Sequence, residues 1–451
     1  MTYISNTAAD RAEMMAAIGI QEFSELLAPI PSAVQLSGEL DLPPPLDEFS
    51  LVRHLQTLAA RNNDLETNVS FLGAGIYDHF RPAVIGALQS RGEFLTSYTP
   101  YQPEVSQGML QAIYEYQSLI CALTAMDLSN ASMYDAATGL AEAALMATSL
   151  TDRTEIVCSR AVHPHYRQVI ETYAKWTGYR VVEAPISGYE TDIEALKACI
   201  GANTACVIAQ QPNFFGCLDD IAAITEAAHG VGALSIVSVD PISLGLLTPP
   251  GDLDVDIVVG EGQSLGSPMG FGGPLLGFFA CKKKFLRSFP GRIVGATVDR
   301  QGRRGYTMTL RTREQDIRRE KATSNICTNQ ALIALAATIY MCELGKNGMR
   351  QVADLCLQKA HYARQRLGSV AGVTVDNAST RFFKEFVVRV DAVPEEINRK
   401  LLQHGIVGGL PLGKYYPDLP NSLLVCVTET KTREDIDRFV DAIAQSLEVR
   451  N

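Results

Sequence analysis

Hydrophobic positions recur at two spacings beyond about residue 110, one typical of helices and one of buried strands. A helical face with the i, i+3, i+4, i+7 pattern is formed by Tyr116, Leu119, Ile120 and Leu123. Short apolar runs predict strands at 155–158, 205–209, 234–239, 255–259 and 274–280, with helical segments such as 219–229 between them. This alternation predicts βαβ units and a largely parallel sheet covered by helices on both faces.

The pattern changes toward both ends of the chain. The first 65 residues suggest short helices around the proline-rich stretch 42–46, either an arm that packs on something else or a solvated leader. Helices are expected from Thr323 to Glu343 and over 349–366, followed by strands at 385–390 and 423–427. We therefore expect an N-terminal helical arm (1–65), a large α/β domain (66–330) and a small C-terminal α/β domain (331–451).

Composition narrows the class of protein. The 451 residues are 47% hydrophobic, which excludes a mainly disordered chain, and the net charge of -11 argues against nucleic acid as the main partner. The charged N-terminus does not resemble a signal peptide, and no run of about 18 apolar residues predicts a membrane span. The ten cysteines are scattered without a CxxC pair, so we expect reduced thiols, no metal site and a cytoplasmic protein.

One short motif suggests a serine hydrolase. Residues 262–266 (GQSLG) match GxSxG, with Ser264 as the nucleophile. That motif requires a strand leading directly into a helix. Pro268 and the glycine-rich stretch 270–273 follow instead, which disfavours a helix and hence the hydrolase. The same stretch also lacks the GxxxxGK[ST] pattern of a nucleotide-binding loop.

Three other positions suggest a cofactor site, although each has an ordinary structural explanation. Thr138 opens an alanine-rich helix whose free N–H groups could hold a phosphate or could simply be capped. His163 and His165 follow a predicted strand, where both could face one metal, but no carboxylate or cysteine stands at a suitable spacing and a structural or stacking residue is favoured. Asp240 ends the strand 234–239, where it could bind a protonated pyridine nitrogen or form a turn.

Together these positions resemble the large domain of fold-type I enzymes that use pyridoxal phosphate (PLP). Such enzymes hold the PLP aldehyde on a lysine some two to three dozen residues after the aspartate, but Gln263 stands 23 residues after Asp240. A carboxamide cannot form the imine, because its nitrogen lone pair is delocalised. The lysines at 282–284 follow one strand too late.

Longer motifs identify a family resemblance over essentially the whole chain. They are FLGAGIYDHF (71–80), YTPYQPEVSQG (98–108), MGFGGP (269–274), GRIVGATVD (291–299) and RREKATSNICTN (318–329). They resemble the P-proteins of the glycine cleavage system, the PLP-dependent glycine dehydrogenases (decarboxylating), and in particular the alpha subunits of the two-subunit form.

The resemblance implies a division of labour between two chains. In that family the beta subunit carries the PLP lysine, at the position that matches Gln263, so Thr138, His163 and Asp240 imply a pseudo-site. PLP is then held by the partner in an α2β2 heterotetramer. The reaction implied is decarboxylation of glycine on PLP and transfer of the aminomethyl group to the lipoyl arm of H-protein, with the isolated chain inactive.

Two surface hypotheses follow. The proline-bounded segment 98–108 could reach the partner's site through Tyr98, Tyr101, Gln102 and Glu104, or be an ordinary dimer contact. The basic segment 311–321 could steer an acidic carrier, or half of its charges could pair internally. Alternatives to this assignment are the Ser264 hydrolase, a self-sufficient PLP enzyme using Lys282 or a neighbour, and a purely structural partner.

Overall fold

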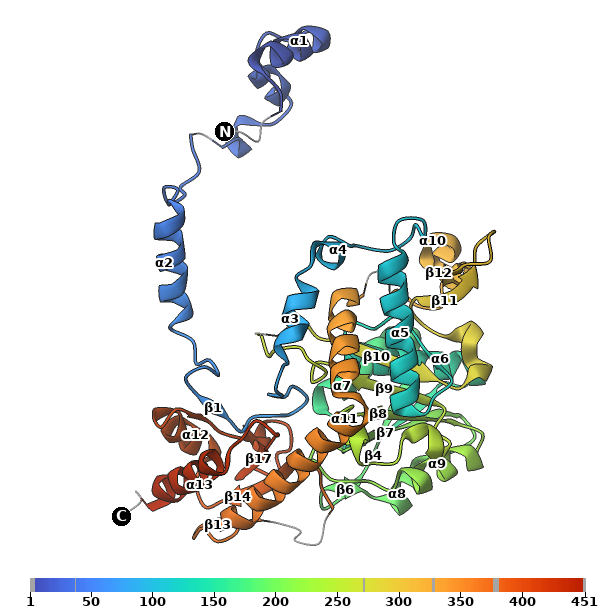
Figure 1. The fold of residues 1–451 in the computed structure, drawn as a ribbon, viewed down its shortest axis with the longest axis vertical. Coiled ribbons are helices and arrows are strands. Elements are labelled where there is room, and N and C mark those ends of the chain that lie inside the picture. The colour runs from blue at the N-terminus through green and yellow to red at the C-terminus, as the bar shows by residue number, and fades with distance from the viewer. Residues whose placement is uncertain (1–4, 37, 271, 327–328, 376–380, 449–451) are drawn as a thin grey trace. The chain divides into compact units, whose positions relative to one another are not determined.

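The computed structural model describes residues 5–36, 38–270, 272–326, 329–375 and 381–448 (Figure 1). Phe271, Cys327 and Thr328, which belong to two of the family motifs, lie outside the described residues. The chain divides into two compact units, Met1–Asn63 and Asp64–Asn451. The further division expected at residue 330 stays a prediction, because 64–451 forms one unit.

The N-terminal unit consists of two helices joined by short 3₁₀ turns. Helix α1 (Ala8–Ile18) begins with a capping box between Thr7 and Asp10, and α2 (Glu48–Ala59) begins at the side-chain cap of Asp47. Among the residues described in this unit, 5–36 and 38–63, none is buried. These helices therefore have no core of their own.

A seven-stranded sheet forms the centre of the second unit (Figure 1). Its strands are parallel from one edge as far as β9, whereas β10 is antiparallel to β9 and β2 to β10. The order is β2 (Leu128–Ser129), β10 (Gly277–Cys281), β9 (Ile257–Glu261), β8 (Leu234–Val239), β7 (Thr204–Gln211), β3 (Glu155–Ser159) and β4 (Arg180–Ala184). The five predicted strands are confirmed. The last begins three residues later than expected, after Pro274, which has no N–H for the sheet.

Helices cover both faces of this sheet, as the pattern predicted. One core contains side chains of α6 (Ala136–Thr151) and α7 (Pro164–Thr177). The opposite core contains side chains of α3 (Ala83–Gln89), α5 (Gln107–Thr124), α8 (Ile193–Cys199), α9 (Ile221–Gly230) and α11 (Ala331–Leu367). Helix α11 is interrupted at Gly345, where φ is 57° and ψ is -172°, so the two helices expected around this glycine are confirmed. The first of them begins at Ala331, whereas it was expected from Thr323.

A smaller antiparallel sheet follows in the order β13 (Val373–Thr374), β14 (Glu385–Val390), β17 (Ser422–Cys426) and β16 (Leu410–Pro411). It packs with α12 (Pro394–Gln403) and α13 (Arg433–Glu448), which begins at a capping box between Thr432 and Asp435. The remaining elements are β1 (Val69–Ser70) with β15 (Ile406–Val407), β5 (Ile186–Ser187) with β6 (Glu190–Thr191), β11 (Ile293–Val298) with β12 (Arg304–Thr309), α4 (Gly92–Leu95) and α10 (Gln315–Arg318). Across the described ranges, we find no helix with the length and apolar character needed to span a bilayer.

Candidate functional site

The pseudo-site residues lie at the carboxyl ends of the parallel strands. His163 follows β3 as the N-cap of α7, Asp240 follows β8, and Gln263 follows β9. Lys384 and Glu385, at the start of strand β14 in the small sheet, lie beside these residues. The backbone of β14 approaches so closely that a Cβ added at Gly216, where φ is 81°, would lie 1.9 Å from the Glu385 carbonyl oxygen.

Asp240 forms a buried ion pair within the chain. The Lys384 Nζ lies 2.6 Å from Asp240 Oδ2, and the side chains are 2% and 9% exposed. Lys384 also lies 3.0 Å from His79 Nε2 and 3.5 Å from the centre of the Tyr77 ring. Burial by itself would lower the pKa of Lys384, but the Asp240 carboxylate, together with Cys426 and Cys356, raises the pKa above its ordinary value. Lys384 is therefore an ammonium with three satisfied contacts.

Gln263 is fixed by backbone groups on both sides of its amide. Its Oε1 accepts from Tyr77 N at 3.0 Å, and its Nε2 donates to Tyr77 O at 3.1 Å and to Ser267 O at 2.8 Å. The side chain is 2% exposed. This amide ties the segment 71–80 over the carboxyl end of the sheet.

The N-terminus of α6, the expected phosphate position, is occupied by carboxylates. Asp135 Oδ1 accepts from Thr138 N at 2.7 Å and from Thr138 Oγ1 at 3.0 Å, which is an ordinary helix cap. Glu261 Oε2 accepts from Ala136 N at 3.2 Å, while Oε1 accepts from the backbone N–H groups of Gln263 and Leu276. Burial raises the pKa of Glu261 to about 7.

His163 is a structural and stacking residue here. Its Nε2 lies 2.9 Å from Ala74 O, its Nδ1 accepts from His165 N at 3.1 Å, and its ring stacks on Tyr166 at 4.5 Å. Nε2 therefore carries the proton and the ring is neutral. Burial lowers the pKa of His163 to about 4, in agreement with that assignment.

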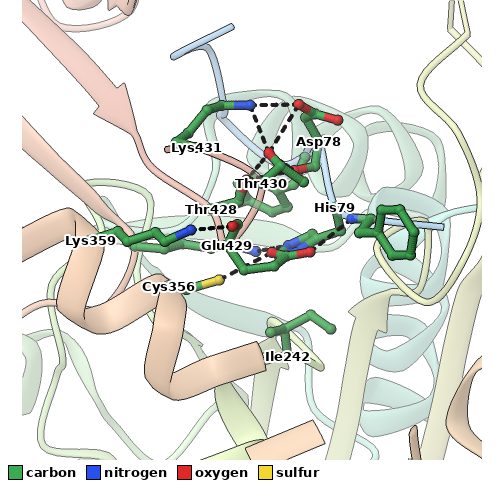
Figure 2. Close-up of polar contacts among 12 residues, drawn as sticks. Asp78, His79, Ile242, Cys356, Lys359, Thr428, Glu429, Thr430 and Lys431 are labelled. Carbon is green, nitrogen blue, oxygen red and sulfur yellow. Dashed lines mark hydrogen bonds and ion pairs between the residues drawn. The ribbon is translucent and has the colours of Figure 1, made fainter. Parts of the chain in front are cut away.

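A second set of buried polar side chains continues from Lys384 into the small sheet. His79 Nδ1 lies 2.6 Å from Glu429 Oε2, which also accepts from Cys356 Sγ at 3.4 Å. Figure 2 shows Cys356 and Lys359, both on α11, directed toward Glu429. Together, His79, Cys356 and Glu429 lie close enough to hold a metal ion.

The contacts of these three side chains are explained without a metal. The Lys384 ammonium donates to His79 Nε2, so the His79 proton is on Nδ1, facing Glu429. Burial lowers the pKa of His79 and raises that of the Cys356 thiol, which keeps both groups neutral. A chain of contacts thus runs from Asp240 through Lys384 and His79 to Glu429, and it joins the two sheets.

PLP does not fit the pseudo-site of this chain. The cavity lined by Tyr77, Asp240, Glu261 and Lys384 has a volume of about 30 Å³, room for one or two waters. Pockets for small ligands are usually about 300 Å³ or larger. The Lys384 ammonium pairs with Asp240, which was expected to face a pyridinium. Carboxyl groups bind at the expected phosphate position, and the amide of Gln263 stands at the expected lysine position.

The geometry also disfavours two alternatives. Ser264 is 2% exposed, its Oγ has no hydrogen-bond partner within the described part of the chain, and no helix follows it, so it is not a nucleophile elbow. Lys282 follows β10, whose last residue pairs with the first residue of β9. It therefore lies at the amino end of the parallel strands, paired with Asp254 and Asp256, at the opposite edge from Asp240.

The segment 98–108 lies outside the pseudo-site, between α4 and α5. Tyr98 is 79% exposed, Gln102 and Glu104 are exposed, and the segment borders a cavity of about 290 Å³. Tyr101 is held within its own chain, because its ring contacts the guanidinium groups of Arg292 and Arg311 at 4.7 and 5.2 Å. Tyr98 is therefore more available to another chain than Tyr101, which is 41% exposed.

The basic segment 311–321 is partly used internally. Arg313 is 8% exposed and donates to the carbonyl oxygens of Phe289 and Gly291, and Arg311 pairs with Asp316. Arg313 is thus structural and cannot steer a carrier. Arg318, Arg319 and Lys321 remain exposed.

Sequence reasoning missed Lys384, Glu385, Tyr77 and His79. Glu385 accepts from Tyr77 Oη at 2.7 Å and from Ala74 N at 2.6 Å, and burial raises its pKa to about 7. The sequence signal for Lys384 and Glu385 was a charged Lys-Glu pair at the start of the apolar strand 385–390. The family motif 71–80 did mark the segment that covers the site.

Comparisons with known proteins agree over the full length of the chain. The family model for the glycine cleavage system P-protein matches residues 1–443. The probable glycine dehydrogenase (decarboxylating) subunit 1 of Moorella thermoacetica is 52% identical over 444 residues, covering 98% of this chain and 99% of that protein. The subunit 1 protein of Thermomicrobium roseum is 51% identical over 448 residues, covering 99% and 100%.

Solved structures show the same fold. A crystal structure of glycine decarboxylase (P-protein) of the glycine cleavage system, in inhibitor-bound form, has a TM-score of 0.90 and 43% identity, covering 99% of this chain and 100% of that chain. The sphingosine-1-phosphate lyase of Burkholderia pseudomallei has a TM-score of 0.65 at 17% identity, covering 93% and 94%, which shows the fold alone. The chain has the predicted fold-type I PLP-enzyme architecture and belongs to the glycine cleavage system P-protein family.

Proposed function

We propose that this chain is the cofactor-free subunit of a heteromeric glycine decarboxylase. It acts with a second subunit that holds PLP, and the assembly, an α2β2 heterotetramer in the cytoplasm, passes the aminomethyl group of glycine to the lipoyl arm of H-protein. The observation that carries the proposal is Gln263, an amide bound on both sides at the lysine position of a family whose relatives are named subunit 1. When bound to the partner, PLP accepts the electrons of the breaking bond to the carboxylate.

The exposed apolar surface of the N-terminal unit is evidence for a partner chain. Leu51, Val52, Leu55 and Leu58, which we call the α2 stripe, follow helical spacing and are 42–53% exposed. Exposed apolar surface that continues over a whole unit marks a protein interface. We assign the partner subunit to this surface, because the subunit 1 relatives imply a companion chain.

In this proposal, segment 98–108 is the part of this chain that reaches the active site of the partner subunit. Tyr98 projects into solvent, so its replacement leaves the contacts around Tyr101 and Arg292 intact. A prolyl-bounded loop loses less entropy on docking than a free one. Tyr98 and its neighbours would then position the substrate or close the partner's site.

Reconstitution tests the function. The two subunits are purified separately and together, and release of carbon dioxide from glycine is measured with lipoylated H-protein as acceptor. We expect no release by this chain alone, release after mixing, and borohydride-fixed PLP only on peptides of the partner. Carbon dioxide release by this chain alone, or PLP fixed to it, would refute the proposal.

The Tyr98→Ala variant distinguishes a contributor to the site from a structural partner. Trp176→Ala is the matched control, since Trp176 is an aromatic residue on α7 with 81% exposure. We expect the Tyr98 variant to assemble normally and to lose tenfold or more in decarboxylation, and the Trp176 variant to retain full rate. Normal assembly and normal rate for both variants would leave this chain with a structural role only.

A further inference from the structure

The pseudo-site contains a set of charges that mirrors those of a bound cofactor. A PLP molecule brings a protonated ring nitrogen to the strand-end aspartate and a phosphate dianion to the helix N-terminus. In this chain, the Lys384 ammonium lies on Asp240, and the carboxylates of Asp135 and Glu261 receive the N–H groups at the start of α6. The sign of the charge at each position is the same as in the loaded site.

We propose that the pseudo-site is self-filled: Lys384 replaces the ring nitrogen of PLP, and Asp135 with Glu261 replaces its phosphate. The site therefore rejects PLP through the filled positions as well as through the missing amine at residue 263. This inference extends the proposed function by giving the reason why the cofactor stays with the partner. The inference can be wrong while the proposed function is right, because the partner can hold PLP whether or not this chain rejects it.

The geometry of Lys384 supports replacement of the ring. Its ammonium is placed by the close contact of β14 with Gly216, it is 2% exposed, and its partners are Asp240, His79 and the face of Tyr77. The Lys384 ammonium should leave Asp240 only when another cation replaces it, because a buried carboxylate without a partner costs free energy. The remaining cavity of about 30 Å³ has no room for a pyridine ring beside it.

The helix N-terminus is filled in the same way. Glu261 accepts three backbone N–H groups, from Ala136, Gln263 and Leu276, and Asp135 accepts from Thr138. A phosphate arriving at this place would compete for donors that are already bound and would be repelled by Asp135 and by the ionised fraction of Glu261. Restoring a lysine at residue 263 alone therefore leaves two of the three obstacles in position.

Variants of the full chain, assembled with its partner and also alone, test the inference. The first is Gln263→Lys. The second, called the opened variant, adds Lys384→Ala, Glu261→Gln and Asp135→Ser, changes that remove charge while keeping a cap and an acceptor. The control carries Lys431→Ala in place of Lys384→Ala, because Lys431 is a buried ammonium that pairs with Asp78 and does not contact Asp240.

Each variant is incubated with PLP and reduced with borohydride, and the labelled peptide is identified by mass spectrometry. The aldehyde carbon of PLP condenses with a primary amine, water leaves, and borohydride reduces the C=N bond to a secondary amine. In the opened variant we expect an absorbance band at about 420 nm before reduction and label at position 263 after it. We expect its apparent PLP affinity to exceed that of Gln263→Lys and of the control at least tenfold.

Three results would overturn the inference. The first is uptake of PLP by Gln263→Lys alone at an affinity similar to that of the opened variant. The second is PLP fixed on Lys384 of the unmodified chain, which would make this lysine a cofactor ligand. The third is absence of uptake by an opened variant whose circular dichroism and assembly with the partner are unchanged.

Thermal stabilisation of Lys384→Ala by PLP, absent for Lys431→Ala, is a further expected result.

Discussion

Replacement of Lys384 by methionine should destabilise the chain strongly, and a second substitution at Asp240 should restore most of the loss. The ion pair between them has a distance of 2.6 Å, with 2% and 9% of the side chains exposed. Removing one partner of such a pair leaves a buried carboxylate without compensation and costs about 3–5 kcal/mol. Asp240→Asn/Lys384→Met removes both charges, so we expect it to lie within about 1.5 kcal/mol of the unmodified chain.

The magnitude can be converted to a melting temperature. The unit Asp64–Asn451 has about 390 residues, so its unfolding entropy is about 0.8 kcal/mol/K and 3–5 kcal/mol corresponds to about 4–6 °C. Calorimetry of the four corners of the double-mutant cycle gives the coupling energy, which we expect to be at least about 4.5 kcal/mol, because each single variant loses about 3–5 kcal/mol and the double variant loses at most about 1.5 kcal/mol. The matched control is Lys431→Met, whose partner Asp78 is 28% exposed, and we expect a loss of about 1 kcal/mol.

Additive effects would refute this reasoning. If Asp240→Asn and Lys384→Met each cost several kcal/mol and the double variant costs their sum, the two side chains are not an ion pair in solution. A Lys384→Met variant as stable as Lys431→Met would lead to the same conclusion. In either case the self-filled description of the pseudo-site would lose its main contact.

Three further predictions concern other parts of the chain. Burial lowers the pKa of His163 to about 4, so the neutral ring contributes stability above pH 6.5, and this stability is lost as the pH falls toward 4. The loss is about 3 kcal/mol. The melting temperature of His163→Gln should therefore fall less over this pH range than that of the unmodified chain. Replacing the three leucines of the α2 stripe by serine should weaken association with the partner at least tenfold, measured by ultracentrifugation. Arg53→Ser, on the other side of α2, should leave this association unchanged. Equal effects of the two changes would contradict the assignment of the α2 stripe to the interface. Arg318→Ala/Arg319→Ala should reduce the salt dependence of H-protein turnover, and an unchanged dependence would exclude steering by this segment.

Much of the large sheet was predictable because local pattern and tertiary burial agree there. Strand 234–239 was predicted with its observed bounds, and the break of α11 at Gly345 followed from a glycine after an apolar helical run. The residues that occupy the pseudo-site were not predictable in the same way. Lys384 lies 144 residues after Asp240 in the chain, and no periodicity links an ammonium at the start of one strand with a carboxylate at the end of another.

Sequence alone determined the class of the chain and its alternating strands and helices, and it places an amide, Gln263, at the position where the family resemblance leads us to expect an imine-forming lysine. These properties depend on residue type and on spacing along the backbone. The tertiary structure alone decided what replaces the missing ligand, because burial of opposite charges depends on which strand ends meet. The contact of β14 with Gly216 brings Lys384 to Asp240, and the cavity that remains beside this pair has a volume of only about 30 Å³.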